Sequence, residues 1–155
     1  MLGNGKYKTN KKTKKQKNDE IIEYVKKDLG YMTKAELRDI LNNICNTDIK
    51  KSASHRELYL AVRKACGNKK TPYLDIYKKY KNKYFGINIR PLEQILNINA
   101  YKRRELEKYK ILKVAYEYKG DFGYISVYDL EGVLNLVGED LDVLLKAERK
   151  RNKLK

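Results

Sequence analysis

The chain has 155 residues, which is enough for one compact domain with its own core and too few for two large ones. Its 36 Lys and Arg outnumber 20 Asp and Glu, so the formal net charge is +16 and the sequence pI is near 9.7. This excess favours a polyanionic partner and excludes an acidic protein that mimics DNA. No run approaches the roughly 18 apolar residues that cross a bilayer, and the first residues lack the apolar segment of a secretory signal. We therefore expect a cytoplasmic protein with no membrane partner.

The N-terminal segment is basic and poor in apolar side chains. The stretch MLGNGKYKTNKKTKKQK contains seven Lys and no Asp or Glu. Such a segment buries too little apolar surface to offset its loss of conformational entropy. We expect residues 1–18 to be a disordered arm that either keeps the protein soluble or binds phosphate groups.

Residues 19–86 have helical periodicity and are predicted to form a helical module. An amphipathic helix opens this segment. Thr33 with Glu36, and Ser54 with Glu57, have the spacing of capping boxes at two further helix starts. The apolar stripes that follow these starts predict two helices packed as a hairpin.

Cysteine and histidine are too few and too scattered to suggest a metal site or a catalytic centre. A structural zinc site needs about four such ligands, whereas this chain has Cys45, Cys66 and His55 without C-x-x-C spacing. The two Cys are expected to be small buried thiols, and His55 a first-turn helix residue. No P-loop or G-x-G-x-x-G run is present. The sequence therefore predicts a protein that is not an enzyme and that binds no cofactor.

A lysine-rich helix is expected after Thr71 and Pro72. Four tyrosines recur along one of its faces: Tyr73, Tyr77, Tyr80 and Tyr84. A packing face is the favoured interpretation of this stripe, with a platform for stacking bases as the alternative. On the opposite side, Lys78 and Lys79 are candidates for contact with nucleic-acid phosphates.

From about residue 90 the pattern predicts a helix, a turn, a second helix, a hairpin and a third helix. Pro91 opens the first helix, LEQILNI, and a helix over 100–110 follows after a short turn that contains Asn. In ILKVAYEYKGDFGYISVYD the apolar period changes to two on both sides of the turn-forming KGDFG, which predicts a β-hairpin. Asp129 is a cap for the third helix, which Gly138 ends.

This order, over roughly residues 90–138, resembles the winged helix-turn-helix fold of the MerR and excisionase-like DNA-binding families. The stretches that carry the resemblance are LEQILNI, NAYKRRELEKYKIL, KGDFGY and VYDLEGVL. The resemblance implies that the second helix enters the major groove and that the hairpin, as a wing, contacts the adjacent backbone or minor groove. The expected fold class is mainly α: a helical bundle with a C-terminal winged helix-turn-helix that carries one β-hairpin.

The second of these helices is expected to be half buried and half exposed. Leu106 and Tyr109 are assigned to its buried side, and the cations to its solvent side. Arg103 and Arg104 are the candidates for base contact, because a guanidinium can bond bidentately to a guanine edge. The predicted DNA-binding residues are Tyr101, Lys102, Arg103, Arg104, Lys108, Lys113, Lys119, Gly120, Lys78 and Lys79. A purely solvated helix face is the alternative.

Residues 139–155 are predicted to form a last helix that ends in a basic tail. Leu141, Leu144 and Leu145 lie on one side of this helix. The stripe either extends the core or pairs with a second copy of the chain in a homodimer.

We expect a non-enzymatic protein that binds double-stranded DNA, as a transcription regulator or as an accessory factor of a phage, plasmid or other mobile element. Such a protein would be cytoplasmic and associated with the nucleoid. Two alternatives stay open. One is a phage or plasmid host-takeover protein of the anti-CRISPR type, which engages a host or element-encoded protein together with its nucleic acid. The other is an RNA-binding protein.

Overall fold

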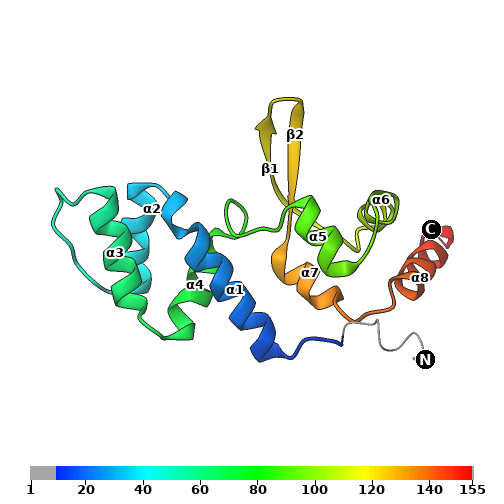
Figure 1. The fold of residues 1–155 in the computed structure, drawn as a ribbon, viewed down its shortest axis with the longest axis horizontal. Coiled ribbons are helices and arrows are strands. Elements are labelled where there is room, and N and C mark those ends of the chain that lie inside the picture. The colour runs from blue at the N-terminus through cyan, green and yellow to red at the C-terminus, as the bar shows by residue number, and fades with distance from the viewer. Residues whose placement is uncertain (1–9, 155) are drawn as a thin grey trace. The chain divides into compact units, whose positions relative to one another are not determined.

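The computed structural model describes residues 10–154, and the chain divides into two compact units (Figure 1). The helical unit comprises Asn18–Phe85. The hairpin unit comprises residues 86–154 together with residues 10–17. Most residues are helical and one two-stranded antiparallel hairpin is present, so the predicted mainly α fold with one β-hairpin is confirmed.

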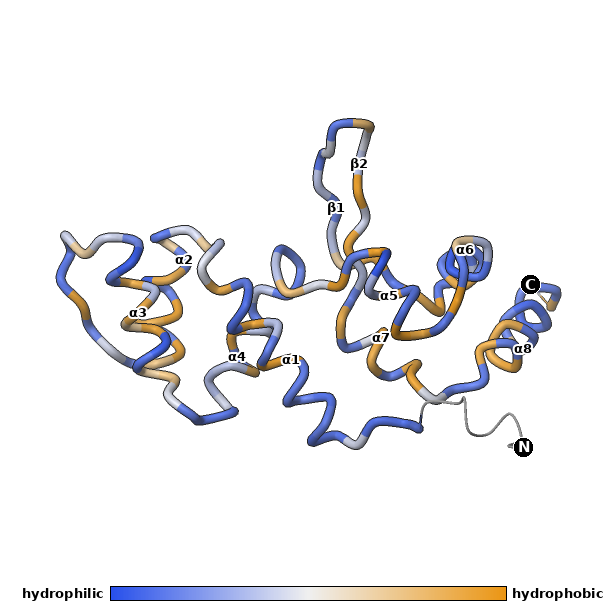
Figure 2. The backbone as a smooth tube through the Cα atoms, viewed as in Figure 1, coloured by the Kyte–Doolittle hydropathy of each residue, from blue (hydrophilic) through white to orange (hydrophobic). Residues whose placement is uncertain are grey.

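The helical unit contains most of helix α1 and three further α-helices. Their bounds are α1 Lys14–Asp28, a 3-10 turn η2 at Leu29–Tyr31, α2 Lys34–Asp39, a π-helical turn η3 at Ile40–Ile44, α3 His55–Cys66 and α4 Lys70–Tyr80. Both predicted capping boxes are present, at Thr33 and at Ser54. The apolar stretches of α2 and α3 lie side by side (Figure 2) and contribute buried side chains to the core, among them Leu37, Leu58 and Val62.

Helix α1 begins before the residue that the sequence indicated. The Thr13 hydroxyl accepts a hydrogen bond from the Gln16 amide at 3.2 Å, and the Gln16 side chain accepts one from the Thr13 amide at 2.9 Å. This reciprocal pair is a capping box and starts the helix at Lys14. The expected disorder is therefore wrong for residues 14–18, and residues 1–9 of the expected arm lie outside the described residues.

The tyrosine stripe of α4 is a packing face. Two of its members are buried and two half-buried: Tyr73, Tyr77, Tyr80 and Tyr84. The Tyr84 hydroxyl donates to Glu36 at 2.7 Å, and the Tyr80 hydroxyl donates to Asp39. Because both acceptors lie on α2, these hydrogen bonds tie α4 and the segment after it to α2.

The hairpin unit has the predicted order of helix, turn, helix, hairpin and helix, followed by a last helix. Its elements are α5 Ile89–Leu96, α6 Ala100–Lys108, β1 Val114–Gly120, β2 Gly123–Tyr128, α7 Leu130–Leu136 and α8 Leu141–Lys153. Asn97 ends α5 in the left-handed conformation with φ 53°, and the Asn99 side chain caps α6 by accepting from the Lys102 amide at 2.8 Å. Asp129 caps α7, as predicted.

The β-hairpin is fixed at its base by the segment that precedes α5. The Ile87 amide donates to the Tyr128 carbonyl at 2.9 Å, and the Tyr128 amide donates to the Ile87 carbonyl at 2.8 Å. Gly86 permits this approach, because a Cβ at this position would clash with the Val127 side chain and lie 3.0 Å from the Tyr128 carbonyl oxygen. The two strands pair from Val114 with Tyr128 to Gly120 with Gly123, with an irregularity in register between Val114 and Tyr116. The hairpin extends away from the helices of its own unit (Figure 1).

The core of the hairpin unit joins all four of its helices to the base of the hairpin. Its buried side chains include Leu92, Leu106, Leu112, Val127, Tyr128, Leu130, Val133, Leu134 and Leu145. Leu106 is buried as predicted, whereas Tyr109 is only half-buried. Leu145 of the last helix is 1% exposed, so the apolar stripe of α8 contributes to the core of its own chain. Every helix in residues 10–154 is too short or too polar to span a membrane.

Candidate nucleic-acid interface

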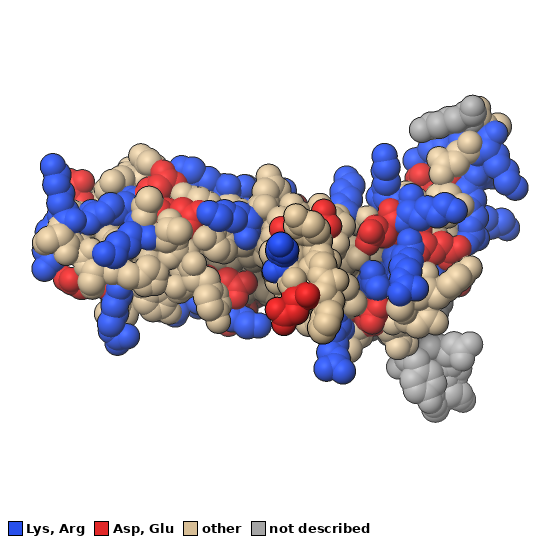
Figure 3. Space-filling model, turned by 90° about the horizontal axis from the view of Figure 1, so that it is seen from above, with Lys and Arg blue, Asp and Glu red and all other residues tan. Residues whose placement is uncertain are grey.

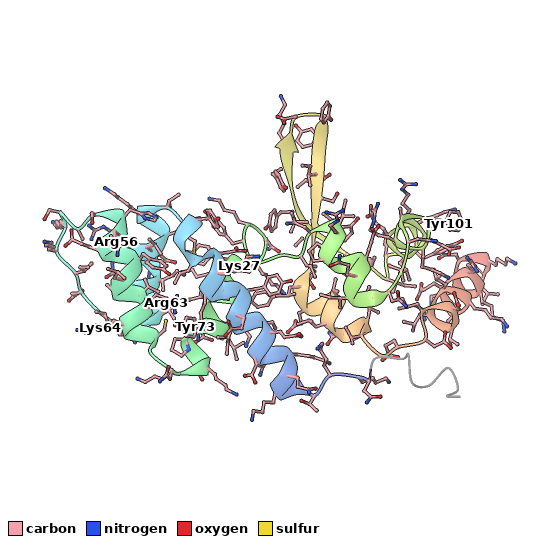
Figure 4. All side chains as sticks on the ribbon, viewed as in Figure 1. Lys27, Arg56, Arg63, Lys64, Tyr73 and Tyr101 are labelled. Carbon is pink, nitrogen blue, oxygen red and sulfur yellow. The ribbon has the colours of Figure 1, made fainter. Side chains whose placement is uncertain are left out.

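Helix α6 has one buried face and one exposed cationic face. Leu106 is fully buried and holds the helix to the core. The exposed residues Tyr101, Arg104 and Lys108 are spaced three and four positions apart, which places them on one stripe of the helix surface. Tyr101 is 74% exposed, and Figure 4 shows it on α6. We call these three residues the α6 stripe.

The two carboxylates of α6 are bound within the hairpin unit. Glu105 forms an ion pair with Arg149 of α8, and Glu107 accepts a hydrogen bond from the Tyr128 hydroxyl at the base of the hairpin. Neither residue belongs to the α6 stripe, and both are half-buried. The negative charges of the sequence YKRRELEKYK therefore do not offset the charges of Arg104 and Lys108 on the outward face.

Arg103 occupies a different position from the one expected. Its side chain is 11% exposed, its Nε lies 2.9 Å from a carboxylate oxygen of Glu93, and its Nη1 donates to the Tyr128 hydroxyl at 3.0 Å. Arg103 lies three positions before Leu106 and hence on the buried side of α6. The prediction that Arg103 lies on the solvent side is wrong. Its guanidinium instead links α5, α6 and the base of the hairpin.

Lys102 is likewise engaged within the unit, through an ion pair with Asp142 of α8. Together with the pair between Glu105 and Arg149, this contact fixes α8 against α6. Of the predicted residues on α6, Arg104 has no ion-pair or hydrogen-bond partner among residues 10–154, and the Lys108 ammonium lies 5.6 Å from the centroid of the Tyr109 ring. These two cations are the ones that remain for an external partner.

The segment between α6 and the hairpin adds two exposed cations. Lys110 adopts φ 60°, a left-handed conformation that turns the chain out of the helix, and Lys113 directly precedes β1. Both side chains are exposed. Within the described part of the chain, Lys113 has no acidic partner.

The hairpin tip presents aromatic side chains to solvent. Lys119 is exposed, and Gly120 pairs with Gly123 where a Cβ on Gly120 would lie 3.1 Å from Ile125 Cγ1. Phe122 is fully exposed and Tyr124 is 75% exposed. Sequence reasoning missed Phe122, although its place in the two-residue turn between the strands was a signal, since a side chain there has no core to pack against.

Lys78 and Lys79 belong to the helical unit, so they are not part of this site. Lys78 is exposed, whereas Lys79 pairs with Asp39 at 2.6 Å. The ammonium of Lys79 therefore takes part in the contact between α4 and α2.

Positive charge is spread over both units (Figure 3). Residues 86–155 contain 14 Lys and Arg against 11 Asp and Glu, and residues 18–85 contain 15 against nine. The segment before them, residues 1–17, contributes seven Lys. The site on α6 is thus defined by how its charges are paired rather than by a large net charge.

No family model, no curated protein and no solved structure matches this chain. Among the described residues, no group of three or more His, Cys, Asp or Glu is placed to hold a metal ion. Burial raises the pKa of the Cys66 thiol to about 12, which makes this side chain unreactive. The function is therefore inferred from the charged and aromatic surface of the hairpin unit.

Proposed function

We propose that the hairpin unit is a winged helix-turn-helix module that binds double-stranded DNA. In this proposal α6 enters the major groove, and the hairpin contacts the adjacent backbone or minor groove. The main support is the pairing pattern on α6: its carboxylates are bound internally, while Arg104 and Lys108 share an outward stripe. Arg104 is the residue proposed to contact a base edge, and Lys108 and Lys113 are proposed to contact phosphates.

The order of elements supports the same proposal. Helices α5 and α6 are separated by a three-residue turn, and the hairpin follows α6 after the five residues 109–113. The contacts of Arg103 with Glu93 and Tyr128 fix α6 relative to both α5 and the hairpin base. A rigid module of this kind can present the helix and the hairpin tip to one duplex at the same time.

The proposed biological role is non-enzymatic regulation of transcription, or an accessory function in a phage, plasmid or other mobile element. Such a role would place the protein with the nucleoid in the cytoplasm. It requires preference for particular duplexes, and Arg104 is the residue expected to provide it.

Duplex binding in a salt series tests this proposal. Each phosphate contact adds about 0.9 to the slope of log K against log salt on duplex DNA. Replacing Arg104 and Lys108 by Gln should lower that slope by about 1.8 if both contact phosphates, and by about 0.9 if Arg104 contacts a base. Fluorescence anisotropy of a labelled duplex measures the slope, and a matched RNA duplex in the same series tests the RNA alternative.

The control removes the same charge from another exposed helix face. Lys146 and Lys150 of α8 are exposed and have no ion-pair partner in residues 10–154. The Lys146→Gln, Lys150→Gln variant should keep most of the parent slope. Equal changes in the two variants, or a flat salt response of the parent, would reject the assignment of α6.

The exposed aromatics of the hairpin support a second candidate function. Phe122 and Tyr124 resemble the aromatic anchors that dominate protein interfaces. In this case the chain would engage a nucleoprotein, holding the protein through the hairpin and the nucleic acid through its cations. Duplex affinity that depends on neither Arg104 nor Lys108 would favour this candidate over direct DNA recognition.

A further inference from the structure

The helical unit carries much of the positive charge, yet the proposed function assigns no role to it. Four of its nine carboxylates form close ion pairs with lysines: Asp19 with Lys70 at 3.0 Å, Glu36 with Lys83 at 2.9 Å, Asp39 with Lys79 at 2.6 Å and Glu57 with Lys50 at 3.1 Å. The surplus cations lie elsewhere on the unit. Three of them border one hollow.

This hollow has a volume of about 550 Å³ and lies between α1, α3 and the start of α4. Its polar lining comes from Lys26 of α1, from Tyr59, Arg63 and Lys64 of α3, from Asn68 in the following turn and from Tyr73. We call it the α1–α3 basic pocket. Three of the lining side chains are cations, and none is a carboxylate.

The positive charge of the pocket is poorly compensated. The Arg63 guanidinium donates from Nη1 to the neutral Tyr59 hydroxyl at 3.1 Å and has no carboxylate partner among residues 10–154. Lys64 is exposed and has no partner in the same part of the chain. Lys26 forms an ion pair with Glu23 at 3.9 Å, and this pair is weak because the Glu23 side chain is 74% exposed; the Lys26 ammonium also lies 5.3 Å from the centroid of the neutral Tyr73 ring.

The geometry holds Arg63 in place for a ligand. Tyr59 packs against Gly30, with its ring 3.7 Å from the position a Cβ on Gly30 would take, and its hydroxyl binds the guanidinium. Figure 4 shows Arg56, Arg63 and Lys64 along α3 and Tyr73 on α4. The C-terminal dipoles of α1 and α3 favour cations in their last turns, but they do not require that cations from two helices border a single hollow.

We propose that the α1–α3 basic pocket binds a phosphate group of a nucleic-acid backbone. A guanidinium matches the geometry of a phosphate bidentately, two ammonium groups add charge, and the Asn68 amide can donate a further hydrogen bond. The proposal goes beyond the function assigned to the hairpin unit, because it does not require α6 to contact DNA. The same chemistry would hold a free phosphate, and the experiment separates these two sources.

The test compares two variants of the full chain that lose equal charge. The pocket variant is Arg63→Gln, Lys64→Gln. The control is Lys34→Gln, Lys51→Gln, whose parent side chains are exposed in the same unit and do not line the pocket. The pocket variant should lower the salt slope of duplex binding by up to about 0.9, the contribution of one phosphate contact, while the control leaves it close to the parent value.

A second pocket variant, Lys26→Gln, Lys64→Gln, keeps Arg63 and its hydrogen bond to Tyr59. It should lower the slope by a similar amount, and thermal unfolding of all three variants checks that the helical unit is intact. If both pocket variants fold and bind duplex DNA with the slope of the control, the proposal is wrong.

A titration of the labelled full chain with inorganic phosphate tests whether the pocket instead holds a free anion. If it shifts the amide resonances of Arg63 and Lys64 saturably at millimolar concentration while the pocket variants keep the parent duplex slope, the pocket is a free-anion site, and the backbone proposal is overturned. Loss of slope in the pocket variants together with an unchanged slope in Arg104→Gln, Lys108→Gln would support this pocket and reject the role of α6. An unchanged slope in the pocket variants, together with loss of slope in Arg104→Gln, Lys108→Gln, would support the role of α6 and reject this pocket.

Discussion

Adjacent arginines of α6 have opposite roles. Arg103 is half-buried and bonded to Glu93 and Tyr128, whereas Arg104 is exposed and has no partner in the described residues. Helical spacing from Leu106 could have separated the two, because Arg103 lies three positions before this core residue. The partners of Arg103 could not be read from the sequence, since Glu93 lies on another helix and Tyr128 on the hairpin.

Because Arg103 is bonded within the unit and Arg104 is not, the two arginines should differ in their effect on the stability of the fold. Arg103→Ala should lower the free energy of unfolding by about 1–3 kcal/mol, because it removes a charge-assisted hydrogen bond and leaves Glu93 without its partner. Arg104→Ala should change it by less than about 0.5 kcal/mol, as is usual for exposed residues. Urea unfolding measures both. Equal stabilities of the two variants would show that the contacts of Arg103 are not structural.

At the scale of elements, the sequence predicted the features that depend on residues close together in the chain. These features are the capping boxes at Thr33 and Ser54, the left-handed turn at Asn97 and the β-hairpin with its alternating apolar residues. The capping box of Thr13 and Gln16 was also readable, but the lysine-rich composition around it concealed the helix start. The pairing of Ile87 with Tyr128 joins positions far apart in the chain, so it gave no local signal.

The contact between α2 and α4 predicts how the helical unit responds to acid. Although burial alone would raise the pKa of Glu36, hydrogen bonds from Thr33, Lys83 and Tyr84 lower it to about 2. Hydrogen bonds from Lys79 and Tyr80 likewise lower the pKa of Asp39 to about 2. Because the folded-state values lie below the ordinary value of about 4, the contribution of these groups to stability is present above that value and is lost as the pH falls from about 5 to 2.

The measurement is thermal unfolding by circular dichroism across this pH range. The parent should lose stability on acidification more steeply than Glu36→Gln, Asp39→Asn, which cannot titrate at these positions. Gln at position 36 can still form a capping box, so the start of α2 is preserved. Parallel pH profiles of parent and variant would contradict the lowered pKa values.

At the scale of the whole molecule, net charge predicted a polyanionic partner but could not locate its site. The excess of Lys and Arg is shared among residues 1–17, the helical unit and the hairpin unit. Only the structure shows which cations are neutralised, as Lys79 and Lys102 are, and which face solvent on α6 or border the α1–α3 basic pocket. Ion pairs between residues distant in the sequence decide which cations are neutralised, and the composition of the chain does not reveal these pairs.

Contact of α6 and the hairpin tip with duplex DNA is the main proposal for this molecule. Amide NMR spectra of the isotopically labelled full chain, recorded during titration with a duplex of about 20 base pairs, test it most directly. We expect the resonances of Tyr101, Arg104, Lys108, Lys119 and Phe122 to shift together and to saturate with the duplex. Unchanged resonances at these five residues, under conditions where the duplex is bound, would contradict the proposal.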